Sequence, residues 1–155
     1  MKMHTKIGLV LLGAALTAPL SAANDPLEKA IQARQAEMQL RSFNAGPLFA
    51  MAKGKIDYDA ELAAMLANNL KLLTNVEMGR AWPQGSDNSA YPGKTTALPK
   101  IWETYPEIAD YGLRYIEAVN NLAAVAGDGK DALRGQIGNL GKSCKGCHDD
   151  FREKK

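Results

Sequence analysis

The residues Cys144-Lys145-Gly146-Cys147-His148 lie near the C-terminus of this 155-residue chain. Two thiols three positions apart, with an imidazole directly after them, have the spacing of a c-type haem attachment site. This spacing suits the chemistry because two thioether bonds hold the porphyrin against one turn of helix, and the next residue then brings its imidazole to the iron. The stretch therefore predicts one covalent haem c, attached through Cys144 and Cys147 and ligated by His148.

Three other interpretations of this stretch are weaker. A structural zinc site uses four protein ligands, and the stretch supplies only three nitrogen or sulfur ligands. A thioredoxin-like redox motif sits at the start of a helix after a strand, and no βαβ pattern is visible in the sequence. The third alternative is an ordinary helix in which this spacing occurs by chance. A disulfide between the two cysteines is also disfavoured, because a bridge across so short a loop would gain little loop-closure entropy.

Residues 1–23 have the three-part layout of a secretory signal peptide. Lys2 and Lys6 give a positive start, residues 7–16 are mostly apolar, and Ser21-Ala22-Ala23 offers small residues for cleavage. The apolar stretch is about half the ~20 residues that cross a bilayer, so an uncleaved membrane anchor is the weaker alternative. We expect a periplasmic protein of one domain, residues 24–155, with no membrane anchor after cleavage.

Removal of this leader takes away two lysines and no acidic residue, which leaves 17 basic and 17 acidic side chains. Such a balance lacks the basic footprint of a nucleic-acid-binding protein. The leader also contains His4, so His148 is the one histidine of residues 24–155. A Ser-His-Asp site would need the imidazole that the haem already uses, and we therefore expect no enzyme activity.

Working outward from the motif, helical spacing of apolar residues predicts an all-α fold, an antiparallel four-helix bundle with the haem in its core. The expected helices cover residues 25–43, 58–77, 104–126 and 130–152. Asp25, Asp57 and Thr104 are the expected N-terminal caps. Gly46-Pro47 is the expected kink or break after the first helix. The irregular stretch 80–98 is long for a compact domain, which indicates that it covers something.

The same spacing predicts which faces point inward. The first helix would turn inward Leu27, Ile31, Arg34, Met38 and Arg41. The second would bury Leu62, Met65, Leu66, Asn69, Leu72, Leu73 and Val76, and the third Ile108, Tyr111, Tyr115, Val119 and Leu122. In the last helix Cys144, Cys147, His148 and Phe151 share one side, and Gly135, Gly138 and Gly141 suggest close approach of either the haem or another helix.

An exported four-helix chain with its haem motif near the C-terminus resembles the cytochrome c′ family, the class II c-type cytochromes. Class I cytochromes c carry the motif near the N-terminus. The resemblance covers residues 24–155 and rests on Arg34-Gln35, Pro99-x-Ile101-Trp102, Gly141-Lys142-x-Cys144-Lys145-x-Cys147-His148 and Phe151-Arg152. It implies a left-handed antiparallel bundle that is often dimeric through its first two helices. Leu48, Phe49 and Met51 give a hint of the apolar outer stripe that a homodimer would need.

The resemblance also implies roles for residues around the haem. The arginine and glutamine that match Arg34 and Gln35 lie by the haem and its propionates in the family. The arginine that matches Arg152 lies near the proximal histidine. The loop before the Pro-x-Ile-Trp segment touches the haem as well, which would place Thr96 nearby.

Met38 decides between two functions that the resemblance leaves open. It lies four residues after Arg34, on the same side of the helix, and by resemblance it occupies the position over the iron opposite His148. Ligation by the Met38 thioether would raise the reduction potential and favour electron transfer to redox partner proteins, which is our main prediction. The alternative is a five-coordinate cytochrome c′ that binds NO or CO at an open site. A third interpretation is ordinary core packing by Met38.

Overall fold

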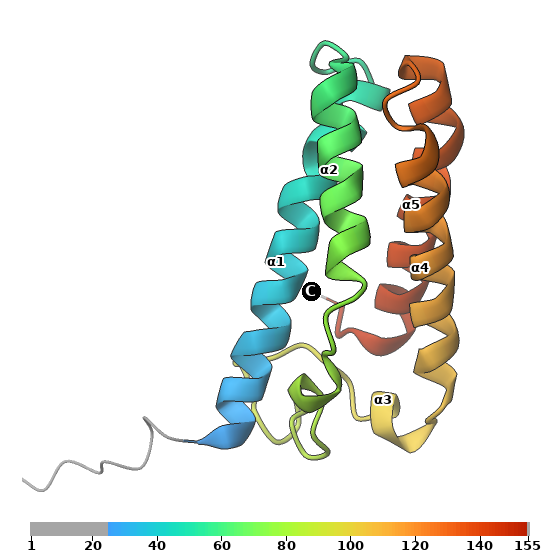
Figure 1. Cartoon of the computed structure of the whole chain (residues 1–155). Coiled ribbons are helices and arrows are strands. Elements are labelled where there is room, and N and C mark those ends of the chain that lie inside the picture. Colours follow the sequence, from blue (N-terminus) through green and yellow to red (C-terminus); the bar gives the residue numbers. More distant parts are fainter. Residues whose placement is uncertain (1–24, 155) are drawn as a thin grey trace, which may run out of the picture.

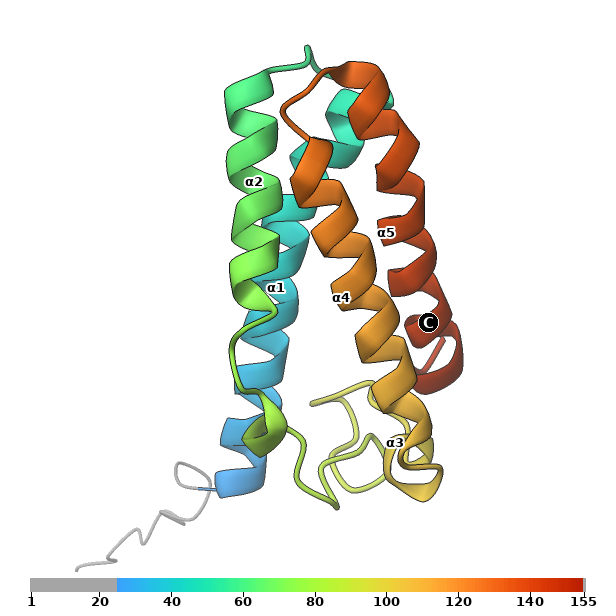
Figure 2. The ribbon, with the colours of Figure 1, turned by 45° about the vertical axis from the view of Figure 1, so that its right-hand side comes forward.

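The computed structural model describes residues 25–154, so the predicted signal peptide lies outside the described residues. Figures 1 and 2 show four long helices side by side, α1 (Pro26–Ala52), α2 (Ala60–Leu73), α4 (Glu107–Val125) and α5 (Lys130–Phe151). The short helix α3 (Lys100–Glu103) and the turn η2 (Gly79–Ala81) lie in the connection between α2 and α4. Helix α1 packs on α2 and α5, and α4 packs on α2 and α5. The predicted all-α four-helix bundle is confirmed.

Helix α1 begins at the predicted cap and ends later than predicted. The Asp25 carboxylate accepts a hydrogen bond of 2.9 Å from the backbone N–H of Leu27, and Pro26 suits the first turn because it lacks an N–H. Of the kink or break predicted at Gly46-Pro47, the break is wrong, since α1 continues to Ala52 with Pro47 inside it. Leu48 and Met51 are both buried in the core, and this packing offsets the backbone hydrogen bond that Pro47 cannot make.

Helix α2 is shorter than predicted and turns a different face inward. It is capped by Asp59, whose carboxylate accepts from the backbone N–H of Leu62 at 3.0 Å, rather than by Asp57. The buried residues are Ala63, Leu66, Ala67 and Leu70. Three residues that we predicted inside are about half exposed, namely Met65 at 52%, Leu72 at 57% and Val76 at 51%. The prediction followed the large side chains, whereas two alanines form part of the packed face.

The last two long helices agree better with their predicted faces. In α4 the residues Tyr115, Val119 and Leu122 are buried, although the helix begins at Glu107, after Pro106, and not at the predicted Thr104 cap. In α5 the buried residues are Leu133, Ile137, Leu140 and Phe151. Of the three glycines singled out in α5, Gly141 alone meets another helix, since a Cβ there would lie 3.4 Å from the Phe49 ring.

The segment between α2 and α4 folds across one end of the bundle (Figures 1 and 2). It is fastened to the end of α5 by two backbone hydrogen bonds. The Leu98 N–H donates to the Phe151 carbonyl at 3.0 Å, and the Glu153 N–H donates to the Thr96 carbonyl at 2.8 Å. This pairing brings the segment beside the haem motif. The length of the stretch 80–98 had indicated only that it covers some part of the molecule.

Within residues 25–154, every helix is too short or too polar to pass through a lipid bilayer.

The corrected start of α2 can be tested by comparing two neighbouring aspartates. We expect Asp59→Ala to lower the free energy of unfolding by about 1 kcal/mol, because it removes the cap of the helix. The control Asp57→Ala changes an exposed residue outside the helix and should alter stability by less than about 0.5 kcal/mol. Urea unfolding followed by circular dichroism measures both. A larger loss at Asp57 would contradict the structure.

Candidate haem-binding site

Helix α5 presents both thiols of the motif toward the interior. Cys144 packs against the core shared by the four long helices, and Cys147 packs against a second cluster formed by Ala97, Ile101 and Phe151. Both thiols are free and half-buried, and burial raises the pKa of each. A redox-active thiol needs the opposite shift, so these surroundings argue against the thioredoxin-like interpretation.

His148 is among the residues that line a hollow of about 940 Å³. Three other predicted site residues line the same hollow, namely Gln35 from α1, Thr96 from the connecting segment and Arg152 from the end of α5. Its volume lies within the range of small-molecule and cofactor sites. The fold thus brings together four residues that are separated by up to 117 positions in the chain.

The surroundings of His148 favour the form of imidazole that binds a metal ion. Burial lowers its pKa, and the positive charge of Arg152 lowers it further. A lower pKa keeps the ring neutral, with a nitrogen lone pair available for iron. Arg152 is itself exposed, so it lies at the rim of the hollow.

Arg34 is buried but does not line this hollow. Its guanidinium donates to the Ser86 hydroxyl at 2.7 Å, to the Thr95 hydroxyl at 3.0 Å and to the Ala81 carbonyl at 3.3 Å, and it also donates to the Ser86 carbonyl. The guanidinium carbon lies 4.9 Å from the centre of the Trp82 ring, within the range of a cation–π contact. Arg34 therefore joins α1 to the segment that covers the site.

Met38 is half-buried on α1, one helical turn after Arg34. Neither Met38 nor the two thiols line the hollow beside His148. Between α1 and α4, two buried polar atoms lack a hydrogen-bond partner. They are the Arg41 Nε and the Tyr115 hydroxyl.

These residues fit a covalent haem. Two inward thiols can form the thioether bonds, and a neutral imidazole beside them can ligate iron. No group of three His, Cys, Asp or Glu side chains in residues 25–154 is arranged to hold a metal ion by itself, which argues against the zinc interpretation.

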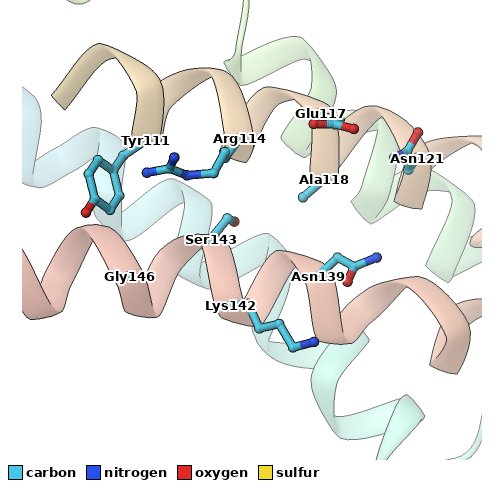
Figure 3. Close-up of a pocket in the computed structure, with 9 residues that line it drawn as sticks. All are labelled: Tyr111, Arg114, Glu117, Ala118, Asn121, Asn139, Lys142, Ser143 and Gly146. Carbon is cyan, nitrogen blue, oxygen red and sulfur yellow. The ribbon is translucent and has the colours of Figure 1, made fainter. Parts of the chain in front are cut away.

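A second hollow of about 280 Å³ lies between α4 and α5 (Figure 3). Tyr111, Arg114 and Glu117 of α4 and Lys142 and Ser143 of α5 are among its lining residues. None of the predicted site residues lines it, so we do not assign it to the haem.

Comparison with known proteins agrees with the site. The family model described as "Cytochrome C'" matches residues 29–152. The chain belongs to the cytochrome c′ family. Cytochrome c′ of Cereibacter sphaeroides is 36% identical over 150 residues, which cover 97% of this chain and 99% of that protein. The solved structure of cytochrome c′ from Rhodobacter sphaeroides matches with a TM-score of 0.82 and 35% identity. The match covers 84% of this chain and 100% of the Rhodobacter chain.

Membership of the cytochrome c′ family confirms the cofactor and the absence of an enzymatic role. Family members carry one covalent haem c, and they are haem proteins rather than enzymes. The two cysteines of the chain stand near its C-terminus, where the family attaches its haem.

Some solved cytochromes c′ carry a bound gas. A variant of cytochrome c′ from Alcaligenes xylosoxidans contains NO (TM-score 0.73, 27% identity, 85% of this chain and 99% of that one). Another variant from the same organism contains carbon monoxide (TM-score 0.71, 28% identity, 83% and 97%). A further cytochrome c′ shows ligand-controlled dimer dissociation (TM-score 0.76, 26% identity, 84% and 99%).

Sequence reasoning missed several residues that shape this site. Ser86 and Thr95 hold the Arg34 guanidinium, and both lie in a stretch without periodicity that we treated only as a loop. Glu37 is buried on the inner side of α1, a position that polar character does not suggest. Arg41 and Tyr115 were predicted to face inward, but nothing in the sequence paired them with each other.

The link between α1 and the covering segment can be tested at Ser86. We expect Ser86→Ala to lower the free energy of unfolding by about 1.5–3 kcal/mol, because a buried charged group loses a hydrogen bond. The control Ser42→Ala changes an exposed serine of α1 and should stay within about 0.5 kcal/mol. Urea unfolding of the haem-loaded protein measures both. Equal stability of the two variants would contradict the role of this contact.

Proposed function

We propose that this protein is a periplasmic, five-coordinate cytochrome c′ that binds NO or CO on the side of the haem opposite His148. The observation that carries the proposal is that solved relatives of the same fold, at 27–28% identity, hold NO and CO. Our main prediction from sequence, electron transfer with Met38 as sixth ligand, finds no support among these relatives. Periplasmic location rests on the predicted signal peptide of residues 1–23.

Under this proposal, each part of the site has a separate task. Cys144 and Cys147 hold the porphyrin through thioether bonds, and His148 supplies the single protein ligand. The iron of the haem supplies the chemistry, which is reversible binding of a small diatomic molecule. Access and polarity on the side opposite the ligand decide what binds there, and Met38 would contribute apolar bulk to that side.

The remaining site residues would hold the periphery of the haem. Gln35 is kept in place by a hydrogen bond of 2.7 Å to the Lys94 carbonyl. Thr96 is fixed by the backbone pairing with the end of α5. Arg34 keeps the covering segment against α1. We assign Arg152 to the environment of the His148 ring, since its charge acts on that imidazole.

The decisive experiment compares the wild-type protein with Met38→Leu. We expect the wild-type ferric spectrum to be that of a five-coordinate haem, and the ferrous spectrum to change on addition of CO or NO. Met38→Leu keeps the apolar bulk and removes the sulfur, so it should leave the ferric spectrum and gas binding unchanged. Absorption spectra with and without each gas measure this.

A wild-type ferric spectrum of six-coordinate iron that Met38→Leu converts to five-coordinate iron would contradict the proposal. In that case Met38 is a ligand, and electron transfer becomes the better interpretation. Ser42→Ala serves as the matched control on α1 because its side chain is exposed.

We further propose a homodimer formed through α1 and α2. Exposed apolar side chains lie on these helices and on the turn after α2, at Leu40, Phe43, Met65, Leu72 and Val76, and α4 exposes Leu113 and Ile116. The residues that hinted at this surface in the sequence were the wrong ones. Leu48 and Met51 lie in the core, and Phe49 packs against Gly141. A solved relative whose dimer dissociation is ligand-controlled supports a dimer in this family.

Phe43 offers the sharpest test of the dimer, because it is 75% exposed on α1. We expect Phe43→Asp to convert a dimer into a monomer, since a carboxylate would be buried without a partner in the interface. The control Leu113→Asp changes a residue of α4 that is 64% exposed and should leave the dimer intact. Sedimentation velocity measures the mass. A monomeric wild-type protein would contradict the proposal.

A further inference from the structure

The inner side of α1 carries an ion pair that the haem-binding roles above do not use. Glu37 is 6% exposed, and its carboxylate pairs with the Arg41 guanidinium one helical turn later. The Arg41 side chain is 26% exposed, so the pair is partly buried, and such burial costs desolvation energy and is weak evidence of a stabilising purpose. The pair therefore calls for another explanation.

Arg41 lies against a second polar side chain that reaches the same place from α4. Its guanidinium carbon is 4.3 Å from the centre of the Tyr115 ring, and Tyr115 is itself buried. Burial raises the pKa of Tyr115 to about 12, so its hydroxyl stays protonated and able to donate. The Arg41 Nε and the Tyr115 hydroxyl are both buried without a partner. Buried polar atoms without a partner are rare in native proteins, and two of them on side chains in contact indicate that a further hydrogen-bonding group belongs here.

The charge of Arg41 acts on both thiols of the motif. Burial raises the pKa of Cys144 and Cys147, and the charge of Arg41 partly offsets that rise at both thiols. For His148 the charged groups that act are Arg152 and Asp149. The charge of Arg41 thus acts on the two attachment points, whereas the charges that act on the imidazole are those of Arg152 and Asp149.

The position of Arg41 on α1 relates it to Met38. Arg41 follows Met38 by three residues, so the two side chains occupy one face of the helix. Met38 is the residue that the proposed function puts opposite His148. The wall on that side therefore combines an apolar thioether with a cation and a phenol, and is not uniformly apolar.

We propose that Arg41, held by Glu37 and Tyr115, is a specificity-determining residue that donates a hydrogen bond to the diatomic ligand bound opposite His148. This inference rests on the proposed function, because it needs a ligand on that side. A charged donor in a partly buried site interacts more strongly with a polarisable ligand than a neutral donor does. It would favour ligands that gain negative charge when they bind, such as NO, over those that do not.

Arg41→Met tests the proposal because it keeps an unbranched apolar stem and removes the charge and the donors. We expect the C–O stretching frequency of the ferrous CO complex to rise, since a donor near the ligand lowers it. We also expect NO to dissociate about tenfold faster, which corresponds to the loss of one charged hydrogen bond. Infrared spectroscopy and stopped-flow trapping measure these two changes.

Arg114→Met is the matched control. Arg114 also stacks on a tyrosine, with its guanidinium carbon 4.1 Å from the centre of the Tyr111 ring, and its charge also acts on Cys147. It is exposed on α4 and faces the hollow between α4 and α5 (Figure 3). Removing this charge should leave the C–O frequency and the NO dissociation rate unchanged.

The outcomes separate this inference from the proposed function. A wild-type protein that binds neither CO nor NO would overturn the proposed function. A wild-type protein that binds CO, together with an Arg41→Met variant of identical C–O frequency, would overturn only the role of Arg41. If Arg41→Met does not fold with haem, Arg41→Lys replaces it, because the shorter ammonium should raise the frequency by a smaller amount. An unchanged frequency in that variant would also overturn the role.

Discussion

The buried guanidinium of Arg34 is the interaction on which the architecture of the site depends. A buried cation is tolerated only when its donors are satisfied, and here the partners come from a segment about fifty residues away in sequence. Satisfying Arg34 therefore fixes the path of residues 81–95 against α1. The same segment continues into the backbone pairing with the end of α5, which places Thr96 beside His148. One charge thus links the first helix to the haem motif of the last.

Polar side chains are unusually frequent on the inner side of α1, and they define what the site can bind. Asn44 is buried, donates to the Leu40 carbonyl at 2.8 Å and accepts from Asn69 of α2 at 3.0 Å, so its polar atoms are satisfied within the protein. Arg34 is satisfied by the covering segment. Arg41 alone of these three keeps a buried donor without a partner. The contrast separates groups that hold the fold from a group that faces a ligand.

Prediction from sequence succeeded where a feature is local. The haem motif is contained in one helical turn, and the apolar spacing of α4 and α5 largely predicted their buried faces. It failed where tertiary packing overrides local signals. Gly46-Pro47 was expected to kink or break α1, but the helix does not end there, and the residues that follow, Leu48 and Met51, are buried in the core. In α2 the large residues pointed the prediction to one face, whereas close packing uses Ala63 and Ala67.

The sequence by itself determined the cofactor and the class of bundle, and it predicts two attachment points and a histidine ligand, because each of these follows from neighbours along the chain. Only the tertiary structure decided which residues share the hollow beside His148. Gln35, Thr96, His148 and Arg152 share one hollow because hydrogen bonds between distant segments bring them there. The pairing of Arg41 with Tyr115 likewise depends on how α1 faces α4, since helical spacing fixes a direction for each side chain but not its partner on the opposite helix.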